Sequence, residues 1–414
     1  MISKTTSRII LLMTIIVISI ITYLINSESF IKHSNRSPNK IALGNKKEGQ
    51  KVLRKPASKA KQHVKNLAKK NKQLPDIGKS LKEKQTVRIG ISLPLSGPDE
   101  ISGDALRSAI LMAYNEIPNN TKFRYEIVIE DSGKEKTFMS TYTLVDIKKV
   151  DALLSVYKDA VTVAPIAEKK KIPHISCSWD ENFLKDSKYS FNHFPSHKKQ
   201  VKDFLKNLED NNIRIFSVIA EEDTFYMDIM SELLKQARKE NFIVASKAVI
   251  KKGAVKFSNE IKEIEEETPE AVLFLMDSRD AGLIASKLNR SKMPFRYTAI
   301  DMMNEINKNL MNGAVYVTSS RGDIMFRENF RRSSILPIPP CAPNVYDAVK
   351  MLVVAFENTN KRIKPSAKDV VKNFSSISKF NSATGEEISV LINKKIESPL
   401  EKAEIYNNRV YYQE

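Results

Sequence analysis

The side chains that could carry chemistry are few and widely spaced in this sequence of 414 residues. Five histidines occur, and two of them lie in a strongly basic N-terminal stretch. His193 and His197 have the spacing of a metal-binding pair on a helix, but Pro195 stands between them and would break that helix. His174 follows a proline in an apolar run, which is typical of a core histidine. We therefore predict neither a metal site nor a catalytic triad.

Motifs for cofactors and nucleophiles are equally lacking. The sequence has no glycine-rich dinucleotide fingerprint, no phosphate-binding loop and no Gly-x-Ser-x-Gly elbow, in keeping with its 12 glycines. The acidic run Glu265-Glu266-Glu267 could suggest a cation site, but adjacent carboxylates on a helix point in different directions. A solvated helix end before Pro269 is the favoured interpretation. We expect no cofactor and no enzyme activity.

The two cysteines and the single tryptophan each leave two interpretations. Cys177 and Cys341 match no zinc-site or disulfide-framework spacing. Two buried free thiols are the favoured prediction, and pairing stays open for an oxidising compartment if the fold brings the cysteines together. Trp179 follows a predicted strand, where it could stack on a ligand or pack beneath its own loop.

The positive charge is concentrated in one segment. Residues 31–85 hold 17 lysines and arginines against three acids, so residues 86–414 carry only +3 of the total net charge of +18. A nearly neutral body argues against nucleic-acid binding. The basic segment has few large apolar residues, which predicts a disordered linker near anionic lipid or cell-wall polymer.

The N-terminus carries a membrane-targeting pattern. Lys4 and Arg8 precede an uncharged apolar run over residues 9–27. Its length lies between that of a signal peptide core and that of a spanning helix, so cleavage and retention as an anchor both stay open.

From residue 86 onward, short apolar runs alternate with longer amphipathic runs, the pattern of repeated βα units around parallel sheets. The predicted strands cover residues 87–93, 125–129, 152–156, 172–177, 213–220, 242–249, 271–276, 297–300 and 314–317. The predicted helices include residues 105–117, 161–170, 227–241, 281–289 and 344–358. Two such sets in one chain predict an α/β fold with two Rossmann-like lobes joined by a hinge.

The ordered landmarks of this region resemble type I periplasmic binding proteins, specifically the leucine/isoleucine/valine-binding branch. The residues that carry the resemblance are 87–98, 103, 113–117, 172–176, 191–195, 346–349, 381–386 and 405–410. The match spans residues 87–412. It implies lobes over residues 86–196 plus 320–382 and over residues 197–319 plus 383–414, preceded by a signal or anchor at 1–30 and the linker at 31–85.

The resemblance also implies a ligand site at the ends of the parallel strands of both lobes. The implied contacts are Tyr157, Lys158, Asp159, Ala160, Ser176, Ser178, Asp180, Phe225, Asp277 and Asp301, with Asp301 as the acid that binds an ammonium group. Lys158, Asp159 and Asp277 depart from the small or apolar residues usual in that family. Lys158 and Asp159 would either bring charge into the cleft or pair with each other.

These departures favour a small polar ligand, an amino acid or a relative of one, that is handed to an ABC permease of the bacterial inner membrane. The expected location is the periplasm or the extracytoplasmic face of that membrane. The alternative is a cell-envelope scaffold that regulates peptidoglycan synthesis with the same fold and without transport.

Overall fold

The computed structural model describes residues 84–414, apart from residues 252, 255, 277, 291–295, 301–310, 361, 397 and 414. The apolar run over residues 9–27 and nearly all of the basic linker therefore lie outside the described residues. Within the described part, no helix has the length and apolarity to cross a bilayer. Residues 80–414 form one compact unit that contains both sheets and every described core cluster. We call this unit the body.

The first lobe is built on a six-stranded parallel sheet in the order β13-β5-β4-β3-β1-β2. Its strands are β1 (Thr86–Leu93), β2 (Arg124–Asp131), β3 (Ala152–Val156), β4 (His174–Cys177), β5 (Ser190–His193) and β13 (Lys395–Ile396). β3 is buried along its whole length and β1 from Ile89 to Leu93, as expected for inner strands of a parallel sheet that is covered on both faces. Every central strand that the sequence predicted in this lobe is present.

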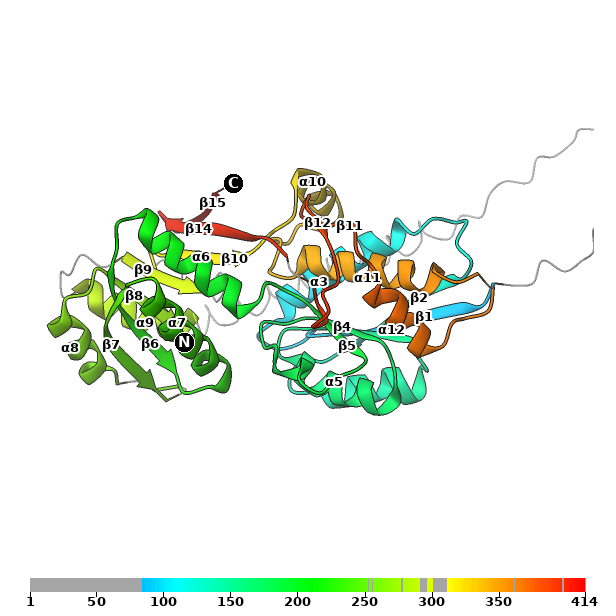
Figure 1. Cartoon of the computed structure of the whole chain (residues 1–414), viewed down its shortest axis with the longest axis horizontal. Coiled ribbons are helices and arrows are strands. Elements are labelled where there is room, and N and C mark those ends of the chain that lie inside the picture. The colour runs from blue at the N-terminus through cyan, green and yellow to red at the C-terminus, as the bar shows by residue number, and fades with distance from the viewer. Residues whose placement is uncertain are drawn as a thin grey trace, which may run out of the picture. The chain divides into compact units, whose positions relative to one another are not determined.

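Helices cover both faces of the first sheet (Figure 1). One layer contains α3 (Glu100–Asn115), α11 (Ala342–Glu357) and α12 (Ala367–Ser375). The other contains α4 (Thr137–Tyr142), its π-helical continuation η2 (Thr143–Ile147) and α5 (Asp159–Lys170). The first layer packs the larger core, in which Phe191 and Phe374 are in ring contact. The lobe is thus a three-layer α/β sandwich.

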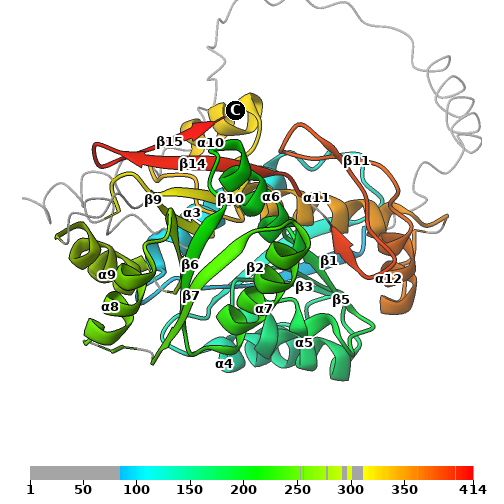
Figure 2. The ribbon, with the colours of Figure 1, turned by 60° about the vertical axis from the view of Figure 1, so that its left-hand side comes forward.

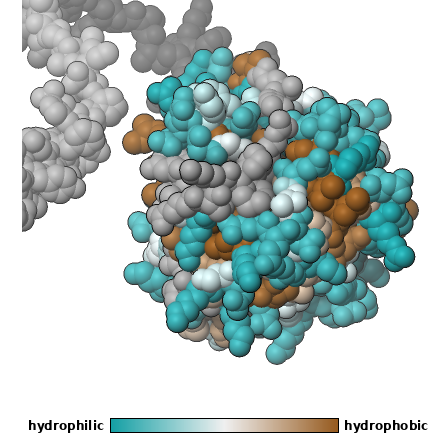
Figure 3. All heavy atoms as spheres, turned by 90° about the vertical axis from the view of Figure 1, so that its left-hand side faces the viewer, coloured by the Kyte–Doolittle hydropathy of each residue, from teal (hydrophilic) through white to brown (hydrophobic). Residues whose placement is uncertain are grey.

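The second lobe has a seven-stranded sheet in the order β15-β14-β10-β9-β8-β6-β7. Its strands are β6 (Ile215–Glu221), β7 (Ile243–Ile250), β8 (Ala271–Leu275), β9 (Arg296–Ile300), β10 (Val315–Ser319), β14 (Leu400–Tyr406) and β15 (Arg409–Gln413). Only the pairings of β14 are antiparallel. On the side of this lobe shown in Figure 3, hydrophobic residues lie scattered among hydrophilic ones.

Alternation along β8 explains how the second sheet holds two helical layers. Val272 and Phe274 enter the core beneath α8 (Ser258–Glu267) and α9 (Ser278–Arg290). Leu273 and Leu275 enter the opposite core, beneath α6 (His197–Asp210) and α7 (Thr224–Lys239). A strand directs successive side chains to opposite faces, so a fully apolar strand requires cover on both. Figure 2 shows α6 and α7 in front of the sheet. The predicted acidic helix end is confirmed as the last turn of α8.

The chain passes between the two sheets three times within the described residues: after β5, after β10 and after β13. After the second passage, α10 (Ile324–Ser333) packs Phe326 and Phe330 into the first core. The third passage differs from the predicted boundary at residue 383. β11 (Phe380–Asn381), β12 (Glu387–Ile388) and β13 precede it, and β13 pairs with β5 of the first sheet. Two-residue strands leave no periodic pattern, which is why the sequence placed this passage too early.

Hydrogen bonds tie the crossing segments together. The backbone N–H of Ser320 donates to the carbonyl of Pro399 over 3.1 Å, and Lys199 Nζ donates to the carbonyl of Ser398 over 2.8 Å. His193, at the end of β5, lies 3.2 Å from the carbonyl of Ile396. The three passages therefore form one connected hinge.

Candidate functional site

Loops that follow the parallel strands of the first sheet meet at its carboxyl edge, where ligands bind in folds of this class. After β1 and β2, the N–H of Leu95 and the hydroxyl of Ser96 donate to the carboxylate of Asp131 over 2.9 and 2.7 Å. Desolvation would raise the pKa of Asp131, but these bonds and those from Gly133 and Lys136 hold it below its usual value. Asp131 is thus a structural acid that fixes two loops.

Asp159 is the predicted contact with the most distinctive environment. It is the first residue of α5 and is 8% exposed. Its Oδ1 accepts a hydrogen bond from Thr137 Oγ1 over 2.8 Å, and no described residue donates to Oδ2. Burial raises the pKa of Asp159, although the nearby hydroxyls of Ser132 and Thr137 and the charge of Lys158 oppose the rise. A buried carboxylate that accepts so few hydrogen bonds would be stabilised by a positive charge nearby.

Lys158 itself is exposed, so the two neighbouring charges have different surroundings. Ala160, the second residue of α5, is fully buried, and the next helical turns pack into the smaller core of the lobe. Of the alternatives open from sequence, charge near the carboxyl edge fits these positions better than a direct Lys158–Asp159 pair, because Asp159 bonds Thr137 instead.

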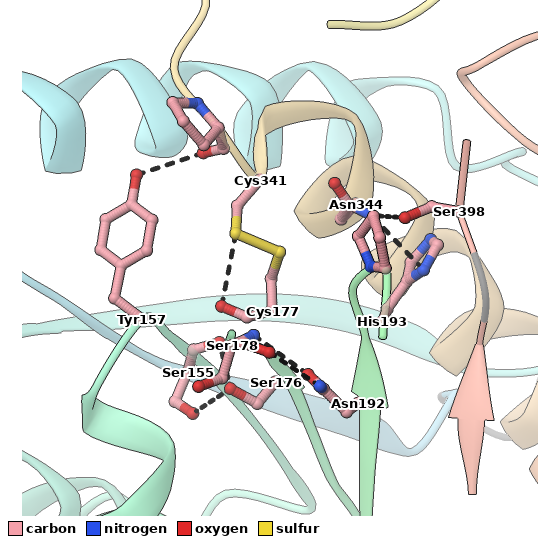
Figure 4. Close-up of a disulfide and its surroundings, with 12 residues drawn as sticks. Ser155, Tyr157, Ser176, Cys177, Ser178, Asn192, His193, Cys341, Asn344 and Ser398 are labelled. Carbon is pink, nitrogen blue, oxygen red and sulfur yellow. Dashed lines mark hydrogen bonds between the residues drawn. A yellow bond between two sulfur atoms is a disulfide. The ribbon is translucent and has the colours of Figure 1, made fainter. Parts of the chain in front are cut away.

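Tyr157 lies next to a disulfide (Figure 4), and its ring stacks on that of Trp179. Their ring centroids are 4.9 Å apart with planes 24° from parallel, and the Tyr157 hydroxyl donates to the carbonyl of Pro340 over 3.1 Å. Tyr157 adopts a φ of 54°, in the left-handed region that non-glycine residues seldom occupy. The packing of its ring holds that conformation. Trp179 is therefore packed against a neighbouring loop residue, as one of its two interpretations proposed.

Cys177 and Cys341 are bonded, with 5.8 Å between their Cα atoms. The favoured prediction of two free thiols was wrong. The two residues are 164 positions apart, and only the packing of α11 against β4 brings them together. The disulfide joins the end of β4 to the start of α11.

The predicted serine contacts lie in a buried polar layer below this edge (Figure 4). Ser176 exchanges hydrogen bonds with Ser155 over 3.1 and 3.2 Å. The N–H and carbonyl of Ser178 both bond the side-chain amide of Asn192, over 3.0 and 2.8 Å. The Ser178 hydroxyl accepts the N–H of Asp180 over 3.2 Å. These polar groups are occupied within the lobe.

His174 confirms its interpretation as a satisfied core histidine. Its ring nitrogens lie 2.8 Å from Ser155 Oγ and 2.9 Å from Ser190 Oγ, and complete burial lowers its pKa to about 3. His193 ends β5 and His197 begins α6, so the two do not share a helix face. No group of three or more potential metal ligands occurs in the part of the chain described.

The predicted contacts from the second lobe stay predictions. Asp277 and Asp301 lie outside the described residues, and so does the side chain of Phe225, the second residue of α7. The structure therefore brings together the first-lobe set at 157–160 and 176–180. Sequence reasoning missed Ser132 and Thr137, although Ser132 directly follows β2 just as Tyr157 follows β3. The same strand-end rule could have found it.

A family model for the periplasmic binding protein matches residues 86–404. The chain belongs to the periplasmic binding protein family. This binding protein matches no curated protein sequence.

Solved structures share the fold of this binding protein at low sequence identity. The leucine-binding protein LivK of Thermotoga maritima is 17% identical, with a TM-score of 0.69 over 79% of this chain and 98% of that one. LivJ of Streptococcus pneumoniae, solved with isoleucine, is 16% identical, with a TM-score of 0.67 over 79% and 98%. A Rhodopseudomonas palustris solute-binding protein solved with benzoate is 15% identical, with a TM-score of 0.64 over 79% and 95%. The resemblance seen in the sequence is thus confirmed, and so is the two-lobed α/β fold.

Proposed function

We propose that this binding protein captures a small polar solute, an amino acid or a derivative, between its lobes and delivers it to an ABC permease. The observation that carries the proposal is the buried, half-supported carboxylate of Asp159 at the carboxyl edge of the first sheet. Related binding proteins hold ligands as different as isoleucine and benzoate, so the family alone names no ligand. The local charge favours a solute with a positively charged group.

The proposed location is the extracytoplasmic side of a bacterial membrane, where such proteins act. The disulfide supports this proposal, because disulfides persist in oxidising compartments and are rare in the cytosol. The basic segment over residues 31–85 would lie near anionic lipid or wall polymer. Since the family consists of solute-binding proteins, we propose no catalysis.

The decisive experiment uses Trp179, the only tryptophan of the chain, as an internal reporter at the proposed site. The body is titrated with amino acids, short peptides and muropeptides while tryptophan fluorescence and melting temperature are followed. A ligand that binds only the native state raises the melting temperature. A saturable change in both signals with one chemical class would support solute capture.

Two variants locate the binding. Asp301→Ala and Asp159→Asn should each weaken binding of a cationic ligand strongly while the unliganded body still melts cooperatively. Asp186→Asn is the matched control, because Asp186 is an exposed acid of the first lobe, like Asp159 in charge but not in burial. Equal affinity in Asp301→Ala and in the control would remove Asp301 from the site.

A second candidate is the cell-envelope scaffold that keeps the fold without transport. It is favoured by one observation: the polar groups of Ser176 and Ser178 are occupied inside the lobe, and Tyr157 packs on Trp179. A body that melts cooperatively and responds to none of the solutes would favour this candidate.

A further inference from the structure

The helix formed by α4 and η2 exposes large apolar side chains to solvent. Its outward side chains include Phe138, Met139, Tyr142 and Ile147, which are 60%, 62%, 47% and 64% exposed. We call these four residues the apolar face. The inward side of α4, by contrast, carries Ser140 and Thr141, both buried. Helices on a protein surface normally turn their polar side to water.

Local hydrogen bonds explain how the polar residues can lie inward. The hydroxyls of Ser140 and Thr141 donate to the carbonyl of Thr137 over 3.0 and 2.7 Å, and Ser140 also contacts Ser92 Oγ at 3.1 Å. These serine and threonine side chains therefore cost little to bury. The buried hydroxyls thus have hydrogen-bond partners, whereas the apolar face is exposed to water.

The π-helical turn keeps the apolar face continuous. It spans Thr143–Ile147, buries Leu144 and Val145 against the sheet and leaves Ile147 on the outside, like Tyr142. An α-helical spacing of five residues would rotate Ile147 about 140° from Tyr142, whereas the wider turn brings the two nearer in direction. Val161 of α5 is also 47% exposed, and α5 packs beside α4 (Figure 2).

Lysines surround the apolar face. Residues 132–171 contain eight lysines and five acids, while the whole of residues 86–414 carries a net charge of only +3. Lys136 pairs with Asp131 and Lys170 with Asp146. The lysines that are exposed and form no ion pair with any described acid include Lys134, Lys148, Lys149, Lys169 and Lys171.

We propose that the apolar face and its surrounding lysines dock this lobe on an anionic lipid bilayer. Aromatic and aliphatic side chains enter the boundary between headgroups and acyl chains, and lysines bind the anionic headgroups. Charge complementarity favours lipid as the occupant, because anionic headgroups would supply negative charge to all of the unpaired lysines around the apolar face. The basic linker also joins the chain to this same lobe at β1, so both would face the same charged surface.

The test measures binding of the body to vesicles. The body is used because its cores lie wholly within residues 80–414 and because the apolar run at 9–27 would bind lipid by itself. Cosedimentation is measured with equimolar phosphatidylglycerol and phosphatidylcholine, and with phosphatidylcholine alone. We expect binding to the first vesicles, weakening as salt is raised, and little to the second.

Two variants separate the apolar and the charged contributions. The double substitution Phe138→Ser and Met139→Ser should lower the partition coefficient at least about tenfold. Lys148→Gln with Lys149→Gln should lower it about twenty-five-fold at low salt, because each lysine near an anionic surface contributes about fivefold. The control is Ile324→Ser with Met325→Ser at the start of α10, where the side chains are 62% and 65% exposed. This control should bind as the unmodified body does.

Depth is read from Phe138→Trp, with the unmodified body and its single Trp179 as background. Lipids brominated on their acyl chains should quench the added tryptophan and leave Trp179 unchanged. The proposal is overturned if the body fails to bind anionic vesicles at low salt, or if the apolar and lysine variants bind as well as the control. It is also overturned if the tryptophan introduced by Phe138→Trp is not quenched, and a protein surface would then be the occupant to seek.

Discussion

His174 makes the stability of the first lobe depend on pH in a direction that the structure fixes. Its ring is fully buried between the hydroxyls of Ser155 and Ser190, and its pKa in the folded protein is about 3 instead of 6.5. Below pH 6.5 the unfolded chain therefore binds a proton that the folded chain does not. The free energy of unfolding should be fully retained above pH 6.5 and should fall as the pH drops toward 3.

The expected size follows from the shift in pKa. Each pH unit below 6.5 removes about 1.4 kcal/mol, so the His174 contribution at pH 5 is a loss of about 2 kcal/mol relative to pH 7.5. The perturbation that isolates it is His174→Gln, which does not titrate. This variant should be less stable at pH 7.5 because the buried serine hydroxyls lose a partner, and its stability should fall less steeply with acid.

The assay is urea unfolding of both proteins at pH 7.5, 6 and 5, followed by the fluorescence of Trp179 in the same lobe. The other histidines and the carboxylates are present in both proteins and cancel in the difference. A difference between the two proteins that shrinks by about 2 kcal/mol from pH 7.5 to 5 would agree with the reasoning. Parallel pH dependences would refute it, because they would mean that His174 titrates alike in the folded and unfolded chains.

Three further outcomes are expected. Gly103→Ala should lower stability by about 3 kcal/mol in urea unfolding, because its Cβ would lie 2.1 Å from the carbonyl oxygen of Pro94; an unchanged midpoint would contradict this contact. Removing the disulfide with Cys177→Ala and Cys341→Ala should lower the free energy of unfolding by up to about 5 kcal/mol, because the bond closes a loop of 164 residues. Alkylation of the native protein without reductant should add no mass, since both cysteines are bonded. Asp347→Ala should cost about 3 kcal/mol, since this buried carboxylate accepts hydrogen bonds from a serine hydroxyl and a backbone amide near the hinge; calorimetry showing an unshifted melting temperature would count against that role.

The sequence predicted the central strands of both sheets because their pattern is strong. Ala152–Val156 is apolar except for Ser155, and its observed bounds equal the predicted ones. The short edge strand β13 gave no such signal, so the last passage between the lobes was misplaced. The helix formed by α4 and η2 was not predicted either, because its outward side is apolar and its inward side contains hydroxyls.

The candidate site was predictable by location more than by side chain. The rule that loops after parallel strands share one edge correctly brought Tyr157 and Trp179 together. It could not show that the polar groups of Ser176 and Ser178 would be occupied within the lobe, since that depends on partners from neighbouring strands. The disulfide was beyond reach for the same reason, because α11 and β4 meet only in the folded chain.

β13 follows every other strand of the first sheet, and β14 follows β6 to β10 of the second, which has a consequence for biosynthesis. β13 supplies an edge strand of the first sheet and β14 pairs with β10 in the second, and both lie beyond residue 394. A chain that stops short of them lacks a strand in each lobe, so an early stop codon here would damage both lobes at once. Neither lobe can be complete until the ribosome has synthesised the segment over residues 395–406.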